Sequence, residues 1–319
     1  MSSPTRVDES YAQRILASLR GAVTLSVITL NTIFWAIPIY IGVLLKLVVP
    51  SLAWRAAVQR RLIPLAEAWI SCNNFILRVF RTTEWSIRGL DGLRRNGRYL
   101  VNANHQSWAD ILVLQRTFNG VVPFLKFFIK QELIWVPVLG LAWWGLEFPF
   151  MKRYSNEFLQ KHPELRGKDL ETTAAMCRRL GNQPISIMNF LEGTRFTEEK
   201  RERQNAPYRY LLRPKAGGIA FVLGAIGGTL SSMLDVTILY EGSGHSLWDF
   251  VCGRVRRVTV DVRERELPRE LVSRDYHEDG EFRDRVQAWV RDLWAEKDSL
   301  IGSMTDEARN AEPPRMAPH

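Results

Sequence analysis

An uncharged run from Gly21 to Leu45 constrains this chain of 319 residues more than any other feature, because it contains 25 residues without a charge. An α-helix rises about 1.5 Å per residue and needs roughly 20 apolar residues to cross the hydrocarbon core of a membrane. A cleaved signal peptide fits poorly, because its apolar region usually has roughly 7–15 residues and a small-residue cleavage site follows it. The run therefore predicts a membrane-associated helix, with a buried core helix as the alternative.

A second segment, 52–80, has apolar residues at helical spacing with arginines between them. Pro38 lies inside the first run, where a proline kinks or breaks a helix. We expect a membrane-anchoring helical segment over 21–80 whose two helices anchor or dip into one leaflet; a full span by the first helix is the close alternative. Orientation stays open because positive charge flanks the first run on both sides. The cations are Arg6, Arg14 and Arg20 before the run, and Lys46, Arg55, Arg60 and Arg61 after it.

The rest of the chain alternates short strands with helical segments. Residues 1–20 are polar. After Arg81 the long apolar segments give way to this alternation of short strands and helices, which predicts an α/β layered domain over 81–302. Segment 133–145 fits a helix or a membrane-facing loop, and the proline-containing segment 303–319 predicts a disordered tail. We expect strands at 85–88, 98–102, 123–130, 148–151, 184–191, 235–240 and 254–262, and helices at 108–118, 169–181, 216–224 and 280–300.

Charge and composition limit the class of partner. The net charge of +9 favours anionic partners such as nucleic acid, acidic lipid surfaces or phosphorylated substrates. No nucleic-acid recognition motif accompanies this charge. A zinc site needs three or more clustered ligands, whereas the three cysteines and five histidines are scattered, so we expect neither a metal site nor a disulfide scaffold.

The segment Asn104–Asp110 follows an apolar strand and leads into an apolar helical run. His105 therefore lies at a strand-to-helix junction, and Asp110 follows it at a distance from which a carboxylate can fold back to the imidazole. Such a pair predicts a general base, because Asp110 holds the tautomer while the other ring nitrogen removes a proton from a hydroxyl. The alternative is that Asn104 or Ser107 caps the helix and that His105 is incidental.

The segment Glu192–Arg195 ends the apolar strand expected at 184–191. Gly193 permits a tight turn or a close approach to a ligand, and Arg195 can bind a phosphate through two parallel hydrogen bonds. Glu192 can accept a hydrogen bond from a hydroxyl or an arginine. The alternative is an ordinary turn with a surface ion pair.

Two further groups of cations follow strand ends. Lys152 and Arg153 come after the strand expected at 148–151, where they suit either phosphate or solvent. The stretch from Arg195 to Lys215 has seven cations against three acids. Such a run is usually a solvated loop, although here it could line an anionic substrate or the membrane surface.

Together these motifs resemble those of the glycerolipid acyltransferase family, best the 1-acylglycerol-3-phosphate acyltransferases and their proteobacterial paralogues. Asn104–Asp110 resembles the NHxxxxD signature of that family, and Glu192–Arg195 resembles its EGTR signature. The resemblance covers about residues 85–245. Further matching elements are 148–153, Lys130–Leu133 with Pro137 and Gly140, and Lys215–Gly217.

The resemblance implies a fold and a set of residue roles. The fold is a glycerol-3-phosphate-acyltransferase-like αβ domain with an N-terminal two-helix membrane motif. By resemblance, His105 is the general base and Asp110 its orienting partner. The implied substrate-binding residues are Glu192, Gly193, Thr194, Arg195, Arg153 and Lys130.

The implied reaction moves a fatty acyl group from an acyl thioester to the free hydroxyl of a lysophospholipid, foremost 1-acylglycerol-3-phosphate, to give phosphatidic acid. Acyl-CoA or acyl carrier protein supplies the acyl group as co-substrate, membrane lipids are partners, and no cofactor, metal or nucleic acid is implied. The implied location is a bacterial inner membrane, with the site on its cytoplasmic side. The alternatives are a paralogue with another lysophospholipid acceptor and a non-catalytic lipid-binding scaffold.

Departures from the family pattern lie outside the His–Asp pair. Leu191 stands where many members have a proline, and the block Leu234–Ile238 lacks the usual valine-proline pair. These departures favour a paralogue with a different acceptor or acyl preference. Residues 245–319 carry no motif that the resemblance explains.

Overall fold

The computed structural model describes residues 11–80, 83–151, 183–272 and 280–310. Its centre is a six-stranded sheet in the order β1-β8-β7-β2-β6-β3, beside a separate two-stranded pair, β4-β5. This arrangement confirms the predicted α/β class. The strands are β1 Glu84–Arg88, β2 Arg98–Ala103, β3 Leu125–Phe127, β4 Ile129–Lys130, β5 Phe150–Met151, β6 Ile185–Phe190, β7 Ser232–Gly242 and β8 Val255–Arg265.

Strand β2 lies at the middle of the sheet, and all of its residues are buried, as expected of a parallel strand covered on both faces. It pairs in parallel with β6 and β7, so that Ala103 lies opposite both Phe190 and Val236. Strand β8 runs antiparallel to β7 and parallel to β1. The carboxyl ends of β2, β6 and β7 therefore meet at one edge of the sheet, the edge where sites form in such folds.

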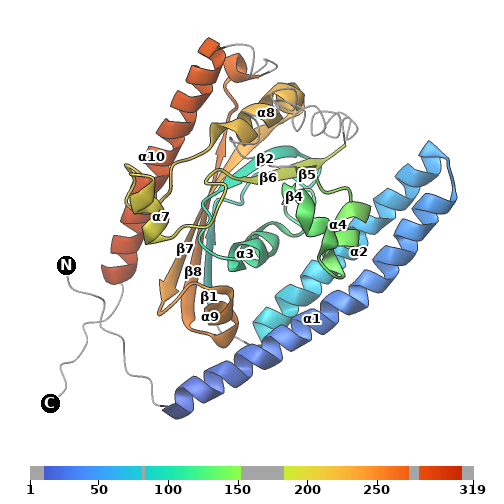
Figure 1. Ribbon diagram of the computed structural model, residues 1–319, viewed down its shortest axis with the longest axis horizontal. Helices are drawn as coiled ribbons and strands as arrows, with labels where there is room; N and C mark the ends of the chain where they lie inside the picture. Colours follow the sequence, from blue (N-terminus) through green and yellow to red (C-terminus); the bar gives the residue numbers. More distant parts are fainter. Residues whose placement is uncertain (1–10, 81–82, 152–182, 273–279, 311–319) are drawn as a thin grey trace.

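Helices cover both faces of the sheet (Figure 1). Helices α3 (Ala109–Phe118) and α9 (Leu247–Cys252) pack on one face, and α8 (Ala216–Ile226) and α10 (Gly280–Asn310) pack on the other. The shorter helices are η1 Gln131–Trp135, α4 Leu139–Gly145, α7 Glu198–Arg203, η3 Gly227–Thr229 and η4 Arg269–Leu271.

Two long helices, α1 (Tyr11–Val48) and α2 (Leu52–Val79), form an antiparallel pair along one side of the domain (Figure 1). Of the kink or break expected at Pro38, the break does not occur, because α1 continues through the proline. Ile39 and Val43 follow the proline and are buried in one apolar cluster with α2 and α4, which holds the helix together past the missing backbone donor.

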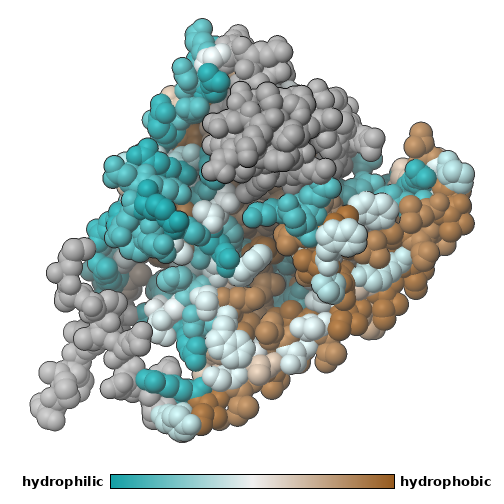
Figure 2. Space-filling view, in the orientation of Figure 1, coloured by the Kyte–Doolittle hydropathy of each residue, from teal (hydrophilic) through white to brown (hydrophobic). Residues whose placement is uncertain are grey.

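The outer face of α1 is apolar and exposed, and Figure 2 shows hydrophobic side chains gathered along this edge of the molecule. By length and composition, α1 is the one helix in the described ranges that could cross a membrane. Only 22% of its most apolar window is buried inside the protein, whereas a core helix would be mostly buried.

Several predicted boundaries move. The single strand expected over 123–130 is divided into β3 and β4, and segment 133–145 forms η1 and α4 rather than a loop. Helix α10 continues to Asn310, where a tail was expected from 303, because Ile301 and Met304 extend its buried stripe. The expected helix at 169–181 and the end of the expected tail, 311–319, lie outside the described residues.

Candidate active site

His105 and Asp110 form the predicted pair at the carboxyl edge of the sheet. His105 lies in the turn after β2, Asp110 lies in the first turn of α3, and His105 Nδ1 is 2.8 Å from Asp110 Oδ2. The Asp110 side chain is fully buried, whereas the His105 side chain is 15% exposed. A carboxylate that accepts Nδ1–H leaves Nε2 as the acceptor nitrogen of the imidazole, so His105 has the tautomer that a general base requires.

The Asp110 carboxylate is fixed by further donors. Its Oδ2 accepts the backbone N–H groups of Gln106 at 2.7 Å and Ser107 at 2.9 Å. Its Oδ1 accepts the hydroxyl of Tyr240, which comes from β7. Burial and the charge of Asp110 raise the pKa of Tyr240 well above its ordinary value, so this hydroxyl keeps its proton and remains a donor.

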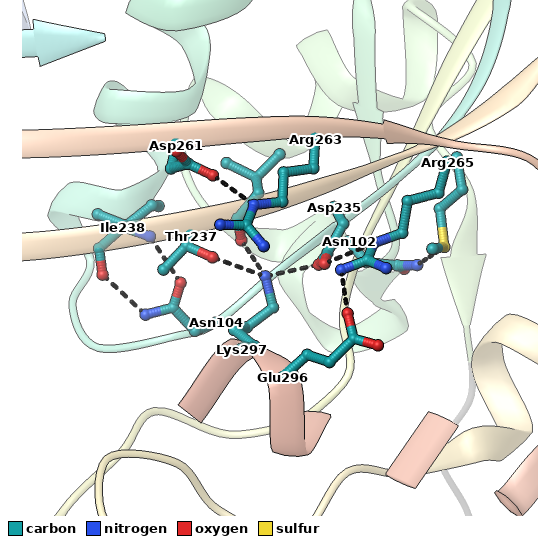
Figure 3. A network of polar contacts seen from close by, with 12 residues as sticks. Asn102, Asn104, Asp235, Thr237, Ile238, Asp261, Arg263, Arg265, Glu296 and Lys297 are labelled. Carbon is teal, nitrogen blue, oxygen red and sulfur yellow. Dashed lines mark hydrogen bonds and ion pairs between the residues drawn. The ribbon is translucent and has the colours of Figure 1, made fainter. Parts of the chain in front are cut away.

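Asn104 does not cap α3 but joins the turn that carries His105 to β7 (Figure 3). Its Nδ2 donates to the carbonyl of Ile238 at 2.9 Å, and its Oδ1 accepts the N–H of Ile238 at 2.8 Å. This side chain therefore continues the hydrogen bonding between β2 and β7 beyond their last paired residues, Ala103 and Val236. The result is a fixed starting point for the turn that carries His105.

Glu192 is fully buried and joins the two motifs. Its Oε1 accepts the N–H of His105 at 2.7 Å, and its Oε2 accepts the N–H of Leu212 at 3.0 Å. Burial raises the pKa of Glu192 to about 7; Asp110 adds to this effect, and the two N–H donors and the charge of Lys297 oppose it. Glu192 was predicted to bind substrate, whereas here each carboxylate oxygen bonds a backbone N–H of the site.

Phe190 holds the imidazole from the side of β6. Its ring stacks on that of His105 with centroids 3.9 Å apart and planes 14° from parallel. Phe127 of β3 stacks on Phe190 in turn, with centroids 6.4 Å apart. Neither aromatic residue had a predicted role, although Phe190 stands at the strand end directly before the Glu192 motif.

The turn at Gly193 brings several cations beside the His–Asp pair. Gly193 has φ +66°, a left-handed conformation that favours glycine, and a Cβ there would lie 3.2 Å from Lys215 Cδ. The guanidinium carbon of Arg195 lies 4.6 Å from the ring centroid of Trp108, which is half-exposed at the start of α3. Thr194 Oγ1 accepts a hydrogen bond from Lys200 Nζ at 2.9 Å. The second motif therefore carries positive charge to the edge of the first.

Two predicted phosphate ligands are not joined to this arrangement. Lys130 is exposed at the end of β4 and makes none of the site's hydrogen bonds to other described residues. Arg153 lies outside the described residues. Their roles stay predictions. Within the ranges that the structure covers, no three His, Cys, Asp or Glu side chains gather as metal ligands.

The chain is similar to several known proteins. Residues 84–240 match the family model described as acyltransferase. Human 1-acyl-sn-glycerol-3-phosphate acyltransferase gamma is 29% identical over 192 residues, which cover 57% of this chain and 46% of the relative. The delta protein of Macaca fascicularis is 27% identical over 215 residues, which cover 63% of this chain and 51% of the relative. The chain thus spans about half the length of the curated relatives it matches.

A crystal structure of the 1-acyl-sn-glycerophosphate acyltransferase PlsC from Thermotoga maritima is also similar. It aligns with a TM-score of 0.53 and 17% sequence identity, over 89% of this chain and 98% of that one. At this identity the likeness shows the fold alone. Because the matched region contains both motifs, residues 84–240 belong to the acyltransferase family, and the curated relatives of this region are 1-acyl-sn-glycerol-3-phosphate acyltransferases.

Proposed function

We propose that this protein transfers a fatty acyl group from an acyl thioester to the free hydroxyl of a lysophospholipid, foremost 1-acylglycerol-3-phosphate, to give phosphatidic acid. The observation that carries the proposal is the 2.8 Å hydrogen bond between His105 Nδ1 and the buried Asp110, with the imidazole partly exposed. The names of the curated relatives support the choice of acceptor.

In the proposed reaction, His105 Nε2 accepts the proton of the lysophospholipid hydroxyl, and the hydroxyl oxygen forms a bond to the thioester carbonyl carbon. Asp110 stabilises the imidazolium that results. The carbon–sulfur bond then breaks, and the imidazolium returns its proton to the departing thiolate. No acyl-enzyme forms in this sequence, which agrees with a chain that has no Gly-x-Ser-x-Gly motif.

The cations beside Gly193 give the phosphate of the acceptor a place to bind. Arg195 is exposed and stacked on Trp108, and Lys215 is exposed beside Gly193. An arginine held by an aromatic ring keeps its planar donors oriented, which favours two-point binding of phosphate. Lys130 and Arg153 are proposed as further phosphate ligands by resemblance. The acyl donor is a thioester of coenzyme A or of acyl carrier protein.

We also propose that α1 and α2 attach the protein to one leaflet of a membrane. Helix α1 packs against α2, α4 and α9 along the domain, and Tyr40 Oη donates to the carbonyl of Val138 at 2.5 Å. A helix held along the domain in this way favours a position in the membrane surface over a span. We place the site on the cytoplasmic side of a bacterial inner membrane, where acyl thioesters and lysophospholipid meet.

The test is an acylation assay of the purified protein with labelled acyl-CoA, or acyl carrier protein, and a panel of lysolipids. We expect product with 1-acylglycerol-3-phosphate, and a loss of about 10²–10⁴-fold in the His105→Ala variant. His245→Ala is the matched control, because His245 is exposed in the turn after β7 and outside the site's hydrogen bonds. Arg195→Ala should mainly raise KM for the acceptor.

Each alternative has its own outcome in this assay. Product with another lysolipid alone would identify a paralogue with a different acceptor. Lipid binding without product from any thioester would identify a non-catalytic scaffold. Near wild-type transfer by His105→Ala would refute the mechanism.

A further inference from the structure

The C-terminal helix α10 has no part in the motifs, yet one of its faces is directed at the site. Trp294, Lys297 and Asp298 follow each other at the i, i+3 and i+4 spacing that places side chains on one helix face. Trp294 is fully buried and Lys297 is 1% exposed, which is rare for a lysine. A buried polar face of this kind calls for specific partners.

The first group of partners is the irregular segment between α7 and α8. The Asp298 carboxylate accepts two backbone N–H groups, that of Arg209 at 2.9 Å and that of Tyr210 at 2.7 Å. Trp294 Nε1 donates to the carbonyl of Leu212 at 3.0 Å. The opposite side of the same residue, the Leu212 N–H, donates to Glu192. Two hydrogen-bonded steps therefore lead from α10 to Glu192, and a third leads from Glu192 to the His105 backbone.

The second group of partners is on β7 (Figure 3). Lys297 Nζ donates to the Val236 carbonyl at 2.6 Å and to Thr237 Oγ1 at 3.2 Å, and it lies 2.6 Å from Asp235 Oδ1. Strand β7 also supplies the two groups that hold the catalytic turn from the other face of the sheet. These are the Ile238 backbone, bonded by Asn104, and the Tyr240 hydroxyl, bonded to Asp110.

We propose that α10 is a positioning element of the active site: through Trp294, Lys297 and Asp298 it holds the Leu212 segment and β7 where Glu192 can fix the backbone of His105. The turnover test of this role rests on the proposed function, because it needs acyl transfer to measure. A second test, the rate of chemical modification of His105, rests on the geometry alone.

Glu192 explains why such support is needed. Both of its oxygens are buried, and a buried carboxylate without donors carries a large desolvation cost. One of its two donors, Leu212, lies in a segment without helix or strand, so no ladder of backbone hydrogen bonds fixes it. Trp294 and Asp298 supply that fixation from outside the segment. A helix that only covered apolar surface would need neither polar contact.

The decisive variant is Asp298→Ala, because Asp298 is only partly buried and its loss leaves the core intact. Asp292→Ala is the matched control, since Asp292 is exposed on the same helix and its loss changes the charge equally. We expect Asp298→Ala to lower kcat about 10-fold, within the roughly 100-fold that a 1 Å misplacement costs. KM for both substrates should stay within about twofold, because neither substrate touches α10 in this scheme. Asp298→Asn keeps one acceptor oxygen and should recover part of the loss.

A second measurement needs no turnover. Diethyl pyrocarbonate modifies accessible imidazoles, and mass spectrometry follows His105, with exposed His245 as the internal reference. We expect Asp298→Ala to raise the modification rate of His105 about fivefold relative to His245, the scale of one lost hydrogen bond, and Asp292→Ala to leave it unchanged.

These two measurements separate the possible failures. A wild-type protein without transferase activity would refute the proposed function, and the His105 modification rate would still test the positioning role. Equal kcat and equal modification rates in the two alanine variants would overturn the positioning role. So would a kcat loss that the unfolded fraction at the assay temperature accounts for. If Asp298→Ala fails to fold, Trp294→Phe removes only the Nε1–H donor while keeping a buried ring, and the same comparison applies.

Discussion

At the scale of single residues, Glu192 is the most consequential group of the site after the His–Asp pair. Two motifs that lie far apart in the sequence meet on its carboxylate, which accepts the N–H of His105 and the N–H of Leu212. Its burial raises its pKa to about 7. The protonation of this one side chain is therefore coupled both to the stability of the folded state and to the geometry of the turn that carries His105.

This coupling predicts how stability depends on pH. The pKa of Glu192 is about 7 in the folded protein against an ordinary value of 4.5, so the folded state binds more protons between these pH values. The contribution of Glu192 to the free energy of unfolding must therefore fall as pH rises from about 4.5 to about 7, and level off above. The Glu192→Gln variant has no titrating group at this position, so it lacks this pH-dependent contribution to the free energy of unfolding.

Chemical denaturation of both proteins in detergent at several pH values between 5 and 8 gives the difference in free energy of unfolding, wild type minus variant. We expect this difference to decrease as the pH rises and to flatten above about 7, since all other titrating groups are common to both proteins. A difference that rises with pH would show that the Glu192 pKa is depressed.

Sequence reasoning found the residues of the site that are local to one another and missed those that are not. His105 and Asp110 lie five residues apart, so turn geometry alone brings them together. Tyr240 is 130 residues from Asp110, and only the pairing of β7 with β2 brings it there. The role of Glu192 depends likewise on where Leu212 lies, which a strand-end motif does not reveal.

At the scale of elements, the longer buried strands and helices were predictable, and the short ones were not. Strand β2 and helix α3 carry apolar patterns of the expected period. Helix α7 is polar throughout and has six residues, so it has no apolar stripe to detect. Helix α9 has the same length, and its signals are local: a Ser246–Asp249 capping box at the start and Gly253 in the left-handed conformation at the end.

The contact between α10 and β7 yields a prediction about stability. Burial lowers the pKa of Lys297, and the ion pair with Asp235 opposes that effect. Lys297→Met removes the cation and leaves Asp235 buried with Arg265 as its remaining partner, which should cost about 3 kcal/mol in the free energy of unfolding. The double variant Lys297→Met, Asp235→Val removes both charges and should recover much of that loss.

Denaturant titrations of the purified variants measure these changes. The matched control is Arg263→Met, which removes a cation from the ion pair with Asp261 on the neighbouring strand β8. The Arg263 side chain is 45% exposed, so its loss should cost less than about 1 kcal/mol. Equal losses for Lys297→Met and Arg263→Met would mean that the buried pair does not tie α10 to the sheet.

At the scale of the whole molecule, the proposals made above give the two flanks of the sheet different tasks. Figure 1 shows α10 along one flank and the α1–α2 pair along the other, and Figure 2 shows that the first flank is hydrophilic and the second hydrophobic. The turn that carries His105 lies between them, at the carboxyl edge of the sheet. In the arrangement that we propose, α10 positions the site from the hydrophilic flank, while α1 and α2 attach the protein to the lipid at the hydrophobic flank.

The exposed face of α1 gives a test of that second task. Phe34, Ile37 and Ile41 are 64%, 56% and 57% exposed, so serine at all three positions should leave the fold intact. Each side chain contributes roughly 1.5–3 kcal/mol when fully buried in an apolar phase, so even partial insertion predicts at least about 100-fold weaker binding to phospholipid vesicles in a flotation assay. Leucine at the same three positions is the control and should bind as the wild type does.

The way in which binding is lost then separates a helix in the membrane surface from one that crosses it. A surface helix is held in the membrane only by the apolar side chains of its outer face, so the serine variant, which loses three of them, should leave the vesicles. It should still acylate lysolipid dispersed in detergent, because its site does not depend on that face. A spanning helix that carried three serines would stay in the bilayer until detergent extracted it, because the apolar residues left in its uncharged run from Gly21 to Leu45 would still hold it there. Retention on the vesicles would therefore overturn the one-leaflet arrangement, even with the reaction itself unchanged.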